Sequence, residues 1–225
     1  AWIDKGKGDP SDSFWVLDPI DGTKGFLRGE QYAIALAYIE RKQVQFGVLG
    51  CPNLSPQGLP ERSSSGAIIG AERGRGAWIA PMTDPESRKP LRVSSCESMS
   101  NARILRSVES SHTNEGKLDE FCRVAEITAD PVCLDSQAKY AIVASGHAEL
   151  LLRLPSLQQP DYREFIWDQA AGSIVVEEAG GKVSDIMGNP LDFSHGKRLE
   201  TNTGILVSNK VLHAPALATL KKLYS

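Results

Sequence analysis

Residues 14–23, FWVLDPIDGT, decide the interpretation of this 225-residue chain. The apolar run at residues 14–17 predicts a buried strand, and the proline- and glycine-containing segment after it predicts a turn. Asp18 stands at the end of that strand and Asp21 follows three residues later. Two carboxylates so placed can converge on a hard cation, which prefers oxygen ligands. The stretch therefore predicts a divalent-metal site, with an ordinary Asp-Pro turn and its side-chain cap as the alternative.

The backbone around the two aspartates offers further groups. The carbonyl of Ile20 can serve as another ligand, and Gly22 lets the chain turn sharply and approach a phosphate. Thr23 adds a hydroxyl and is expected to open a helix, whose first N–H groups can face an anion. The extension to Gly-Thr-Lys therefore favours phosphate chemistry over a purely structural turn.

The spacing of the aspartates argues against one competing mechanism. A class of phosphatases uses Asp-x-Asp-Gly-Thr, in which an aspartyl nucleophile stands two residues before a second aspartate. Here Pro19 and Ile20 separate Asp18 from Asp21, so the first carboxylate cannot share that geometry. The spacing favours metal-activated water over a phospho-enzyme.

A second acidic element lies at residues 166–172, IWDQAAG. Asp168 stands where a periodic helix over residues 168–179 is predicted to begin. Its carboxylate either caps that helix, with a favourable dipole interaction of ~0.3–1 kcal/mol, or reaches across to Asp18 and Asp21. The small residues that follow Asp168 would permit the close packing that the second interpretation requires.

Two patterns divide the chain. Up to about residue 100, short apolar runs between polar loops predict a mostly antiparallel β region. After Asn101, strands alternate with helices, which predicts an α/β region. We therefore predict two domains, residues 1–102 as the C-terminal part of an α+β metal-binding domain and residues 103–225 as an α/β domain that completes the substrate site. The expected strands are at residues 14–17, 32–39, 44–49, 67–70, 77–80, 91–94, 104–108, 131–134, 149–154, 182–185 and 204–207, and the expected helices at 115–125, 136–144, 168–179 and 209–224.

Composition bounds the class of protein. Hydrophobic residues make up 41% and charged residues 24%, with a formal net charge of -3, so nothing indicates a nucleic-acid or membrane surface. The four cysteines show no C-x-x-C spacing, which is typical of reduced thiols in a cytosol-like compartment. No apolar run reaches the roughly 20 residues of a membrane span. Ala1 is not an initiator methionine, and a turn-rich stretch leads at once into a strand, so we interpret the chain as a fragment that lacks an N-terminal part.

Both acidic elements resemble known signatures. DPIDGT at residues 18–23 and WDxAxG at 167–172 are similar to the paired motifs of the inositol-monophosphatase-like, lithium-sensitive phosphatase superfamily. The longer string DPIDGTKGFLR at residues 18–28 resembles its 3′(2′),5′-bisphosphate nucleotidase branch, and the resemblance covers essentially the whole chain. Three further strings support that branch: SVExxH at residues 107–112, SQAKY at 136–140 and LRLP at 152–155.

The resemblance implies a fold and a metal centre. The fold would be a layered αβαβα sandwich, with an antiparallel sheet first and a mixed or parallel sheet with helices second. Asp18 would bridge two Mg²⁺ ions, with the Ile20 carbonyl on one and Asp21 and Asp168 on the other. Thr23 would hold or help to deprotonate the attacking water. Two or three Mg²⁺ ions are expected in the full-length enzyme.

The resemblance also implies a nucleotide site. His112 and Ser136 would contact the nucleoside or its phosphate, whereas Lys139 and Arg153 would pair with the 5′-phosphate that is not cleaved. Without the family spacing, a lysine such as Lys139 is more often a solvated helix charge, and an arginine such as Arg153 is more often part of a surface ion pair. The implied substrate ligands are Gly22, Thr23, His112, Ser136, Lys139, Arg153 and Asp168.

One departure from the family pattern concerns the N-terminus. Full-length members carry a further, partly helical region with a Gly-Glu-Glu motif that binds metal and an aspartate that pairs with the threonine hydroxyl. Residues 1–10 contain neither. The resemblance therefore implies that one metal lacks a ligand, that Thr23 lacks its partner and that part of the core is uncovered, so impaired activity of this chain is expected.

The implied reaction is hydrolysis of the 3′-phosphate of adenosine 3′,5′-bisphosphate to AMP and phosphate, with 3′-phosphoadenylyl sulfate as a further candidate substrate. Such an enzyme would depend on Mg²⁺, would be inhibited by Li⁺ and would belong to sulfur metabolism. The alternatives are a related phosphatase for inositol phosphates or fructose 1,6-bisphosphate, and a truncated binding fragment without catalysis. A cytoplasmic monomer that binds a small nucleotide, with no nucleic-acid or membrane partner, is expected.

Overall fold

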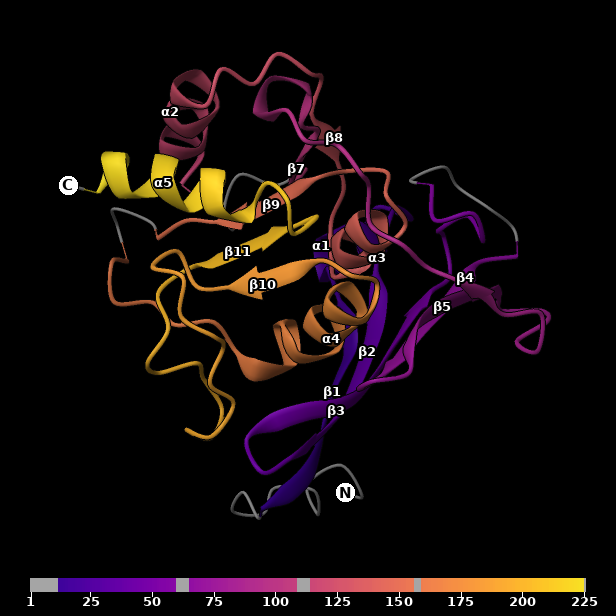
Figure 1. Ribbon diagram of the computed structural model, residues 1–225. Coiled ribbons are helices and arrows are strands. Elements are labelled where there is room, and N and C mark those ends of the chain that lie inside the picture. The colour runs from indigo at the N-terminus through magenta and orange to yellow at the C-terminus, as the bar shows by residue number, and fades with distance from the viewer. Residues whose placement is uncertain (1–11, 60–64, 109–113, 156–158, 225) are drawn as a thin grey trace.

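The computed structural model describes residues 12–59, 65–108, 114–155 and 159–224, which form two β-sheets and the helices packed on them (Figure 1). The first sheet lies against a pair of central helices, the second sheet covers the other side of that pair, and two further helices lie beyond the second sheet. This order of layers confirms the predicted sandwich of sheets and helices.

The first sheet is antiparallel and has the strand order β1-β2-β3-β4-β5-β6. Each strand pairs with its neighbour in sequence, and short turns join β2 to β3 and β4 to β5. Alternating burial on β2 points its alanines and Ile39 inward, toward the central helices. The strands are β1 (Ser13–Asp21), β2 (Ala33–Glu40), β3 (Gln43–Cys51), β4 (Ala67–Glu72), β5 (Gly76–Pro81) and β6 (Lys89–Pro90).

The second sheet is mixed and has the order β10-β11-β9-β7-β8. The pairs β7–β8 and β7–β9 are parallel, whereas β9, β11 and β10 pair antiparallel. Its central strands β9 and β11 are buried along almost their whole length, as is typical of a sheet that is covered on both faces. The strands are β7 (Ile104–Arg106), β8 (Val132–Cys133), β9 (Leu150–Arg153), β10 (Lys182–Ser184) and β11 (Ile205–Ser208).

The helices fill the two remaining layers. The central pair, α3 and α4, packs between the sheets, and α2 and α5 pack against each other on the far face of the second sheet. A short helix, α1, follows β1 directly. The helices are α1 (Thr23–Leu27), α2 (Glu115–Val124), α3 (Ala138–Ala144), α4 (Ala170–Glu178) and α5 (His213–Leu223), with 3₁₀ turns at Met99–Asn101 and Ile166–Asp168.

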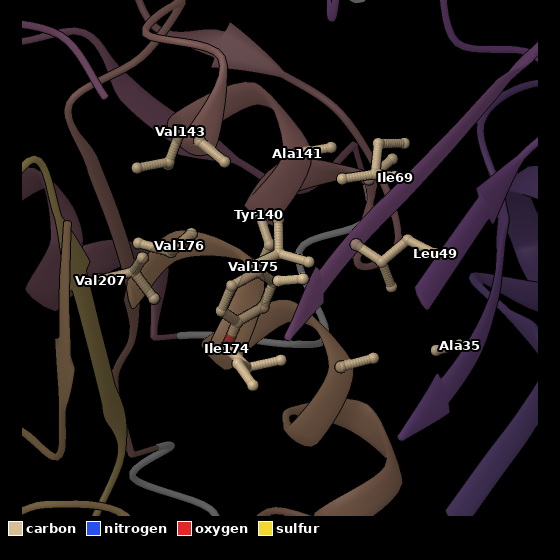
Figure 2. Packing of buried hydrophobic residues seen from close by; sticks show 14 of the residues in the cluster. Ala35, Leu49, Ile69, Tyr140, Ala141, Val143, Ile174, Val175, Val176 and Val207 are labelled. Atoms are coloured by element: carbon tan, nitrogen blue, oxygen red, sulfur yellow. The ribbon is translucent and has the colours of Figure 1, made fainter. Parts of the chain in front are cut away.

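The main core lies between the two sheets and draws on both halves of the chain. Figure 2 shows its members from β2 to β4, from α3 and α4 and from β11 gathered around the central helices. Glycines bring the layers close: a Cβ on Gly47 would lie 2.6 Å from Ile174 Cγ2, and one on Gly172 would lie 2.4 Å from Tyr140 Cγ. The close packing expected after Asp168 is therefore present in the structure.

This close approach makes a stability prediction. Replacing Gly172 by alanine adds a methyl group against the Tyr140 ring, and overpacking of this kind costs about 1–3 kcal/mol, more than the roughly 1 kcal/mol of helix propensity that alanine gains. We expect a lower urea midpoint for Gly172→Ala. The control is Gly116→Ala on α2, where the nearest atom to the new Cβ is Asn114 Oδ1 at 3.6 Å. Equal midpoints for the two variants would show that α3 and α4 are not packed this closely.

The opposite face of the first sheet is apolar and exposed. Trp15 and Leu17 are 58% and 54% exposed, and the Trp15 ring lies 5.0 Å from that of Tyr38 and 6.3 Å from that of Phe46. An apolar sheet face normally packs against another layer. In the αβαβα sandwich that the sequence predicts, this is the face that belongs to the outermost helical layer.

Several predicted bounds were wrong. Residues 91–94 form no strand; instead the Leu91 and Val93 N–H groups donate to the carbonyls of Ala77 and Ala179, while β6 is only two residues long. The helix expected from Asp168 begins at Ala170 after a 3₁₀ turn. The closing helix begins at His213 rather than at residue 209. Its proline lies in the first helical turn, where no backbone N–H has an intrahelical partner to lose.

Within the described ranges, no helix is both long enough and apolar enough to cross a membrane. The proposed division at residue 102 falls between the Met99–Asn101 turn and β7. Because the main core contains residues from both sides of that point, the two parts share one packing unit, and their division into domains stays a prediction.

Candidate active site

The two aspartates of the DPIDGT segment lie on the same side of the first sheet because β1 contains a bulge. Asp18 is paired with Ala35 and Asp21 with Ala33, so three steps along β1 match two steps along β2. Side chains alternate along a regular strand, and residues three apart would point to opposite faces. The extra residue of the bulge restores a common side for the two carboxylates.

Asp168 supplies the third carboxylate. It ends the Ile166–Asp168 turn, which packs against β1, and its side chain does not cap α4. Oxygen atoms of Asp18, Asp21 and Asp168 all lie within 4.8 Å of one another. Of the two interpretations of Asp168, the structure therefore favours the one in which its carboxylate reaches the pair on β1.

The raised pKa values of this carboxylate cluster indicate that it would bind a cation. Burial raises the pKa of Asp21 to about 6, with repulsion from Asp18 adding to the effect. Burial likewise raises the pKa of Asp168 to about 7, opposed by Arg153 and reinforced by Asp21. Three half-buried carboxylates that repel one another are relieved by a divalent cation, and an all-oxygen donor set suits a hard ion such as Mg²⁺. The residues present therefore fit the metal that the sequence predicts.

The backbone between the aspartates is tightly organised. The Ile20 N–H donates to Asp18 Oδ1 at 3.0 Å, and the Thr23 hydroxyl donates to the Ile20 carbonyl at 3.2 Å. Gly22 has φ +81°, and a Cβ there would lie 2.8 Å from Ser136 Cβ. Only glycine tolerates both the conformation and this contact, so the turn can approach the second half of the chain at this position.

The β8–α3 turn is attached to the DPIDGT segment at several points. The Gln137 N–H donates to Asp21 Oδ2, next to the contact between Ser136 and Gly22. One residue earlier, Asp135 Oδ2 accepts from Arg28 Nη2 at 2.5 Å, while its Oδ1 accepts from the Val108 N–H at 3.1 Å. These contacts hold the predicted nucleotide segment beside the carboxylate cluster.

Two basic side chains complete the cavity. Lys139 on α3 is buried and donates to Ser107 Oγ at 2.6 Å; burial and then repulsion from Arg153 lower its pKa to about 8. Arg153 ends β9 and is paired with Glu164. Burial alone would lower the pKa of the guanidinium, but the attraction of Glu164, Asp168 and Asp21 together raises it. Neither residue is the solvated surface charge that the sequence left open as an alternative.

A cavity of about 250 Å³ collects most of the predicted residues. His112 lies outside the described residues. The roles of these residues as ligands or catalytic groups stay predictions. The predicted residues that line the cavity are Asp18, Ile20, Asp21, Gly22, Thr23, Ser136, Lys139, Arg153 and Asp168.

Sequence reasoning missed the residues that hold the site together. Asp135 and Gln137 lie on either side of a predicted ligand, Ser136, but no spacing in the sequence indicates which of their atoms would reach β1 or α1. Glu164 stands four residues before Asp168 and was not singled out, because a lone glutamate in a loop has no distinctive pattern. Arg28 was quoted as the last residue of a longer string without a role.

The pKa shifts predict how metal and pH act together. An aspartate whose folded pKa is raised stabilises the folded chain below its unfolded pKa of about 4, and that stabilisation is lost as the pH rises through the folded value. For Asp21 and Asp168 the loss occurs through about pH 6 and about pH 7. We therefore expect Mg²⁺ to raise the unfolding temperature more at about pH 8 than at about pH 5.5. Thermal unfolding with and without Mg²⁺ measures this; an equal shift at both pH values would contradict it.

The layers and the carboxylate cluster define an α/β sandwich with a candidate metal site, and comparison with known proteins identifies its family. Residues 3–224 match the model of the Inositol monophosphatase family. An IMPase from Thermotoga maritima superposes with a TM-score of 0.71 at 25% identity, covering 97% of this chain and 73% of that chain. An inositol monophosphatase from Anabaena also reaches 0.71, at 21% identity, over 96% and 74% of the two chains.

Curated relatives are more similar in sequence. A 3′(2′),5′-bisphosphate nucleotidase from Oryza sativa is 45% identical over 218 residues, which are 93% of this chain and 60% of the relative. One from Schizosaccharomyces pombe is 41% identical over 229 residues, which are 97% of this chain and 64% of the relative. The chain thus spans 60% to 64% of the length of these two relatives. It belongs to the inositol monophosphatase family, as its motifs predict.

Proposed function

We propose that the protein is a Mg²⁺-dependent phosphatase that hydrolyses the 3′-phosphate of adenosine 3′,5′-bisphosphate to AMP and phosphate. The observation that carries the proposal is the position of three carboxylates and two basic side chains, the buried Lys139 and the largely buried Arg153, around one cavity. A substrate with two phosphates matches this division, because one phosphate needs a metal and the other needs fixed positive charge. The names of the curated relatives support the same substrate class.

The carboxylate cluster would hold the metal. Asp18, Asp21 and Asp168 provide the side-chain ligands, and the Ile20 carbonyl stands next to them in the bulge. Bound Mg²⁺ would polarise the phosphoryl oxygens and lower the pKa of an attacking water. The number of ions, two or three, is part of the proposal.

The chain's own residues would orient the ester. Thr23 carries its hydroxyl at the start of α1, within 3.2 Å of the Ile20 carbonyl, where it can accept or pass on the proton of an incoming water. Gly22 has no side chain to obstruct a phosphate, and its N–H would be available to it. Lys139 and Arg153 would bind the 5′-phosphate and so fix the distance between the nucleoside and the reacting phosphate.

A phosphate-release assay tests this function. In the presence of Mg²⁺ we expect faster release from adenosine 3′,5′-bisphosphate than from inositol 1-phosphate, and inhibition by Li⁺. Faster release from the inositol ester would overturn the nucleotide proposal and favour an inositol phosphatase, the activity that the names of the structural neighbours suggest. 3′-Phosphoadenylyl sulfate belongs in the same assay as a second candidate substrate.

Binding without turnover is tested separately, because the chain spans only part of the length of its relatives. Calorimetric titration with Mg²⁺ and then with AMP, the proposed product, measures both sites without a reaction. Binding of both ligands without phosphate release would identify a binding fragment, the alternative that the sequence left open. Binding of neither would overturn the proposed site.

A cytoplasmic location is proposed on the cysteines. Cys51, Cys96, Cys122 and Cys133 are all free thiols, and Cys51 is completely buried. Unpaired cysteines are the rule in reducing compartments. The proposal also includes a monomer with no nucleic-acid or membrane partner, for which the net charge of -3 is the support.

A further inference from the structure

Glu164 lies directly behind the cavity arginine. Nε of Arg153 donates to Glu164 Oε1 at 3.0 Å, and Nη2 of Arg153 lies 2.8 Å from Glu164 Oε2. The two side chains are 17% and 8% exposed, so this is a largely buried bidentate pair. The carboxylate takes the side-on edge of the guanidinium, the one formed by Nε and Nη2.

Glu164 is itself held from several directions. Gln169 Nε2 donates to Glu164 Oε2 at 3.1 Å, and Gln169 Oε1 accepts from the Tyr140 hydroxyl on α3. The Glu164 carbonyl accepts from the Leu199 N–H at 2.9 Å. Gln169 and Tyr140 are 0% and 2% exposed. A carboxylate fixed by buried partners on both its side chain and its backbone can in turn fix the group that it binds.

This pairing determines which donors Arg153 has left. A guanidinium has five N–H groups, and Glu164 occupies one on Nε and one on Nη2. Arg153 lines the cavity, and none of the residues in the described ranges accepts a hydrogen bond from its Nη1. The remaining edge, Nη1 with the outer N–H of Nη2, has the fork geometry that suits two phosphate oxygens.

Arg153 needs such an anchor because the metal-binding carboxylates also attract it. After Glu164, the carboxylates of Asp168 and Asp21 are among the charges that raise the pKa of its guanidinium. An arginine free to move would form an ion pair with them and would no longer present its fork to a ligand. Glu164 instead holds the edge of the guanidinium that is formed by Nε and Nη2.

We propose that Glu164 is a positioning residue that sets the preference of the site for a second phosphate: it holds the side-on edge of Arg153 so that the end-on edge is presented in the cavity. The proposal rests on the proposed function, in which Arg153 binds the 5′-phosphate. Glu164 does not touch the substrate. It acts only through Arg153.

The test uses AMP and adenosine, which differ only in the 5′-phosphate and are not hydrolysed. The ratio of the adenosine Kd to the AMP Kd, measured by calorimetry in the presence of Mg²⁺, reports what that phosphate contributes. In Glu164→Gln the amide places an N–H group toward donors of Arg153 or Gln169, so the bidentate hold is lost. We expect the ratio to fall by about 10-fold, the size of one charge-assisted hydrogen bond, with little change in the Kd of adenosine.

The matched control is Glu149→Gln. Glu149 forms the same kind of bidentate pair with Arg103, at 3.1 Å to Nε and 2.6 Å to Nη2, and neither residue lines the cavity. This variant removes a buried carboxylate from an Arg–Glu pair without touching Arg153. Its ratio should equal that of the wild type. Thermal unfolding shows whether the two variants are folded. If Glu164→Gln does not fold, Glu164→Asp replaces it. This variant keeps the charge but shortens the side chain, and it should also lower the ratio of the two Kd values.

The outcomes distinguish a failure of the proposed function from a failure of the inference about Glu164. If the wild-type ratio is 1, the 5′-phosphate has no site here, and the nucleotidase proposal fails together with the inference that rests on it. If the wild type prefers AMP and the Glu164 variant keeps or increases that preference, the function stands and the inference is overturned. An increased preference would identify Glu164 as an anion that competes with the phosphate.

Discussion

Replacing Asp21 by asparagine is expected to weaken Mg²⁺ binding by about 100-fold or more, because a carboxylate ligand to a divalent cation contributes several kcal/mol and each 1.36 kcal/mol is a factor of ten. Asp21 belongs to the cluster whose carboxylate oxygens lie within 4.8 Å of one another, and its Oδ2 also accepts from the Gln137 N–H. Asparagine keeps the shape and can keep that hydrogen bond through its carbonyl oxygen. The variant therefore removes charge and a ligand with little change in packing.

Asp21→Asn should weaken Mg²⁺ binding but should not destabilise the metal-free chain. Burial raises the pKa of Asp21 to about 6, so at neutral pH the charged side chain opposes folding of the metal-free chain. A neutral asparagine removes this penalty and part of the repulsion felt by Asp18 and Asp168. We expect the metal-free variant to unfold at the same temperature as the wild type or higher. A damaged fold would instead lower both metal binding and stability.

Calorimetry with Mg²⁺ and thermal unfolding without it provide both measurements. Asp84→Asn is the control, because Asp84 is an exposed aspartate in the loop before β6. Wild-type Mg²⁺ affinity in Asp21→Asn would contradict the metal site. A large fall in the unfolding temperature of the metal-free variant would contradict the electrostatic account of it.

The cluster also shows which features a sequence can predict. Asp18, Asp21 and Asp168 were predicted together because their two short motifs resemble a family signature; from its position alone, Asp168 was as well explained as a helix cap. The bulge in β1 was not predicted, since the residue that it inserts is visible only when Ala33 and Ala35 are paired opposite. Yet the bulge is what places the first two carboxylates on one side.

Local sequence patterns also predicted most of the fold, and the prediction failed where contacts join residues that are distant in sequence. Apolar periodicity located most strands and the core helices, because burial dictates those residues, but the predicted burial of residues 14–17 was wrong, since Trp15 and Leu17 are 58% and 54% exposed. It failed at residues 91–94, LRVS, where the N–H groups of Leu91 and Val93 donate single hydrogen bonds to Ala77 and Ala179 instead of pairing along a strand. It also gave no indication of Glu164, a loop residue whose carboxylate pairs with Arg153 on β9. Contacts between polar groups distant in sequence leave no local pattern.

Replacing Lys139 by methionine is expected to weaken AMP binding by about 10- to 100-fold, since a hydrogen bond to a charged group contributes about 1.5–3 kcal/mol. Methionine keeps most of the volume of the buried side chain and removes its charge. Mg²⁺ should bind at least as tightly as in the wild type, because Lys139 lies close enough to Asp21 to lower the pKa of that carboxyl, and a positive charge there also repels a cation. Opposite changes for the two ligands distinguish a phosphate ligand from a structural lysine.

The pH dependence gives an independent measurement of the same role. Burial and repulsion from Arg153 lower the pKa of Lys139 to about 8, so its charged fraction falls as the pH rises through that value. Wild-type AMP affinity should therefore decline above about pH 8, and the decline should be absent from Lys139→Met. The control is Lys117→Met, since Lys117 pairs with Glu120 away from the cavity. If the control and Lys139→Met lose AMP affinity equally, the lysine on α3 is not the phosphate ligand, and Arg153 alone would have to account for the second phosphate.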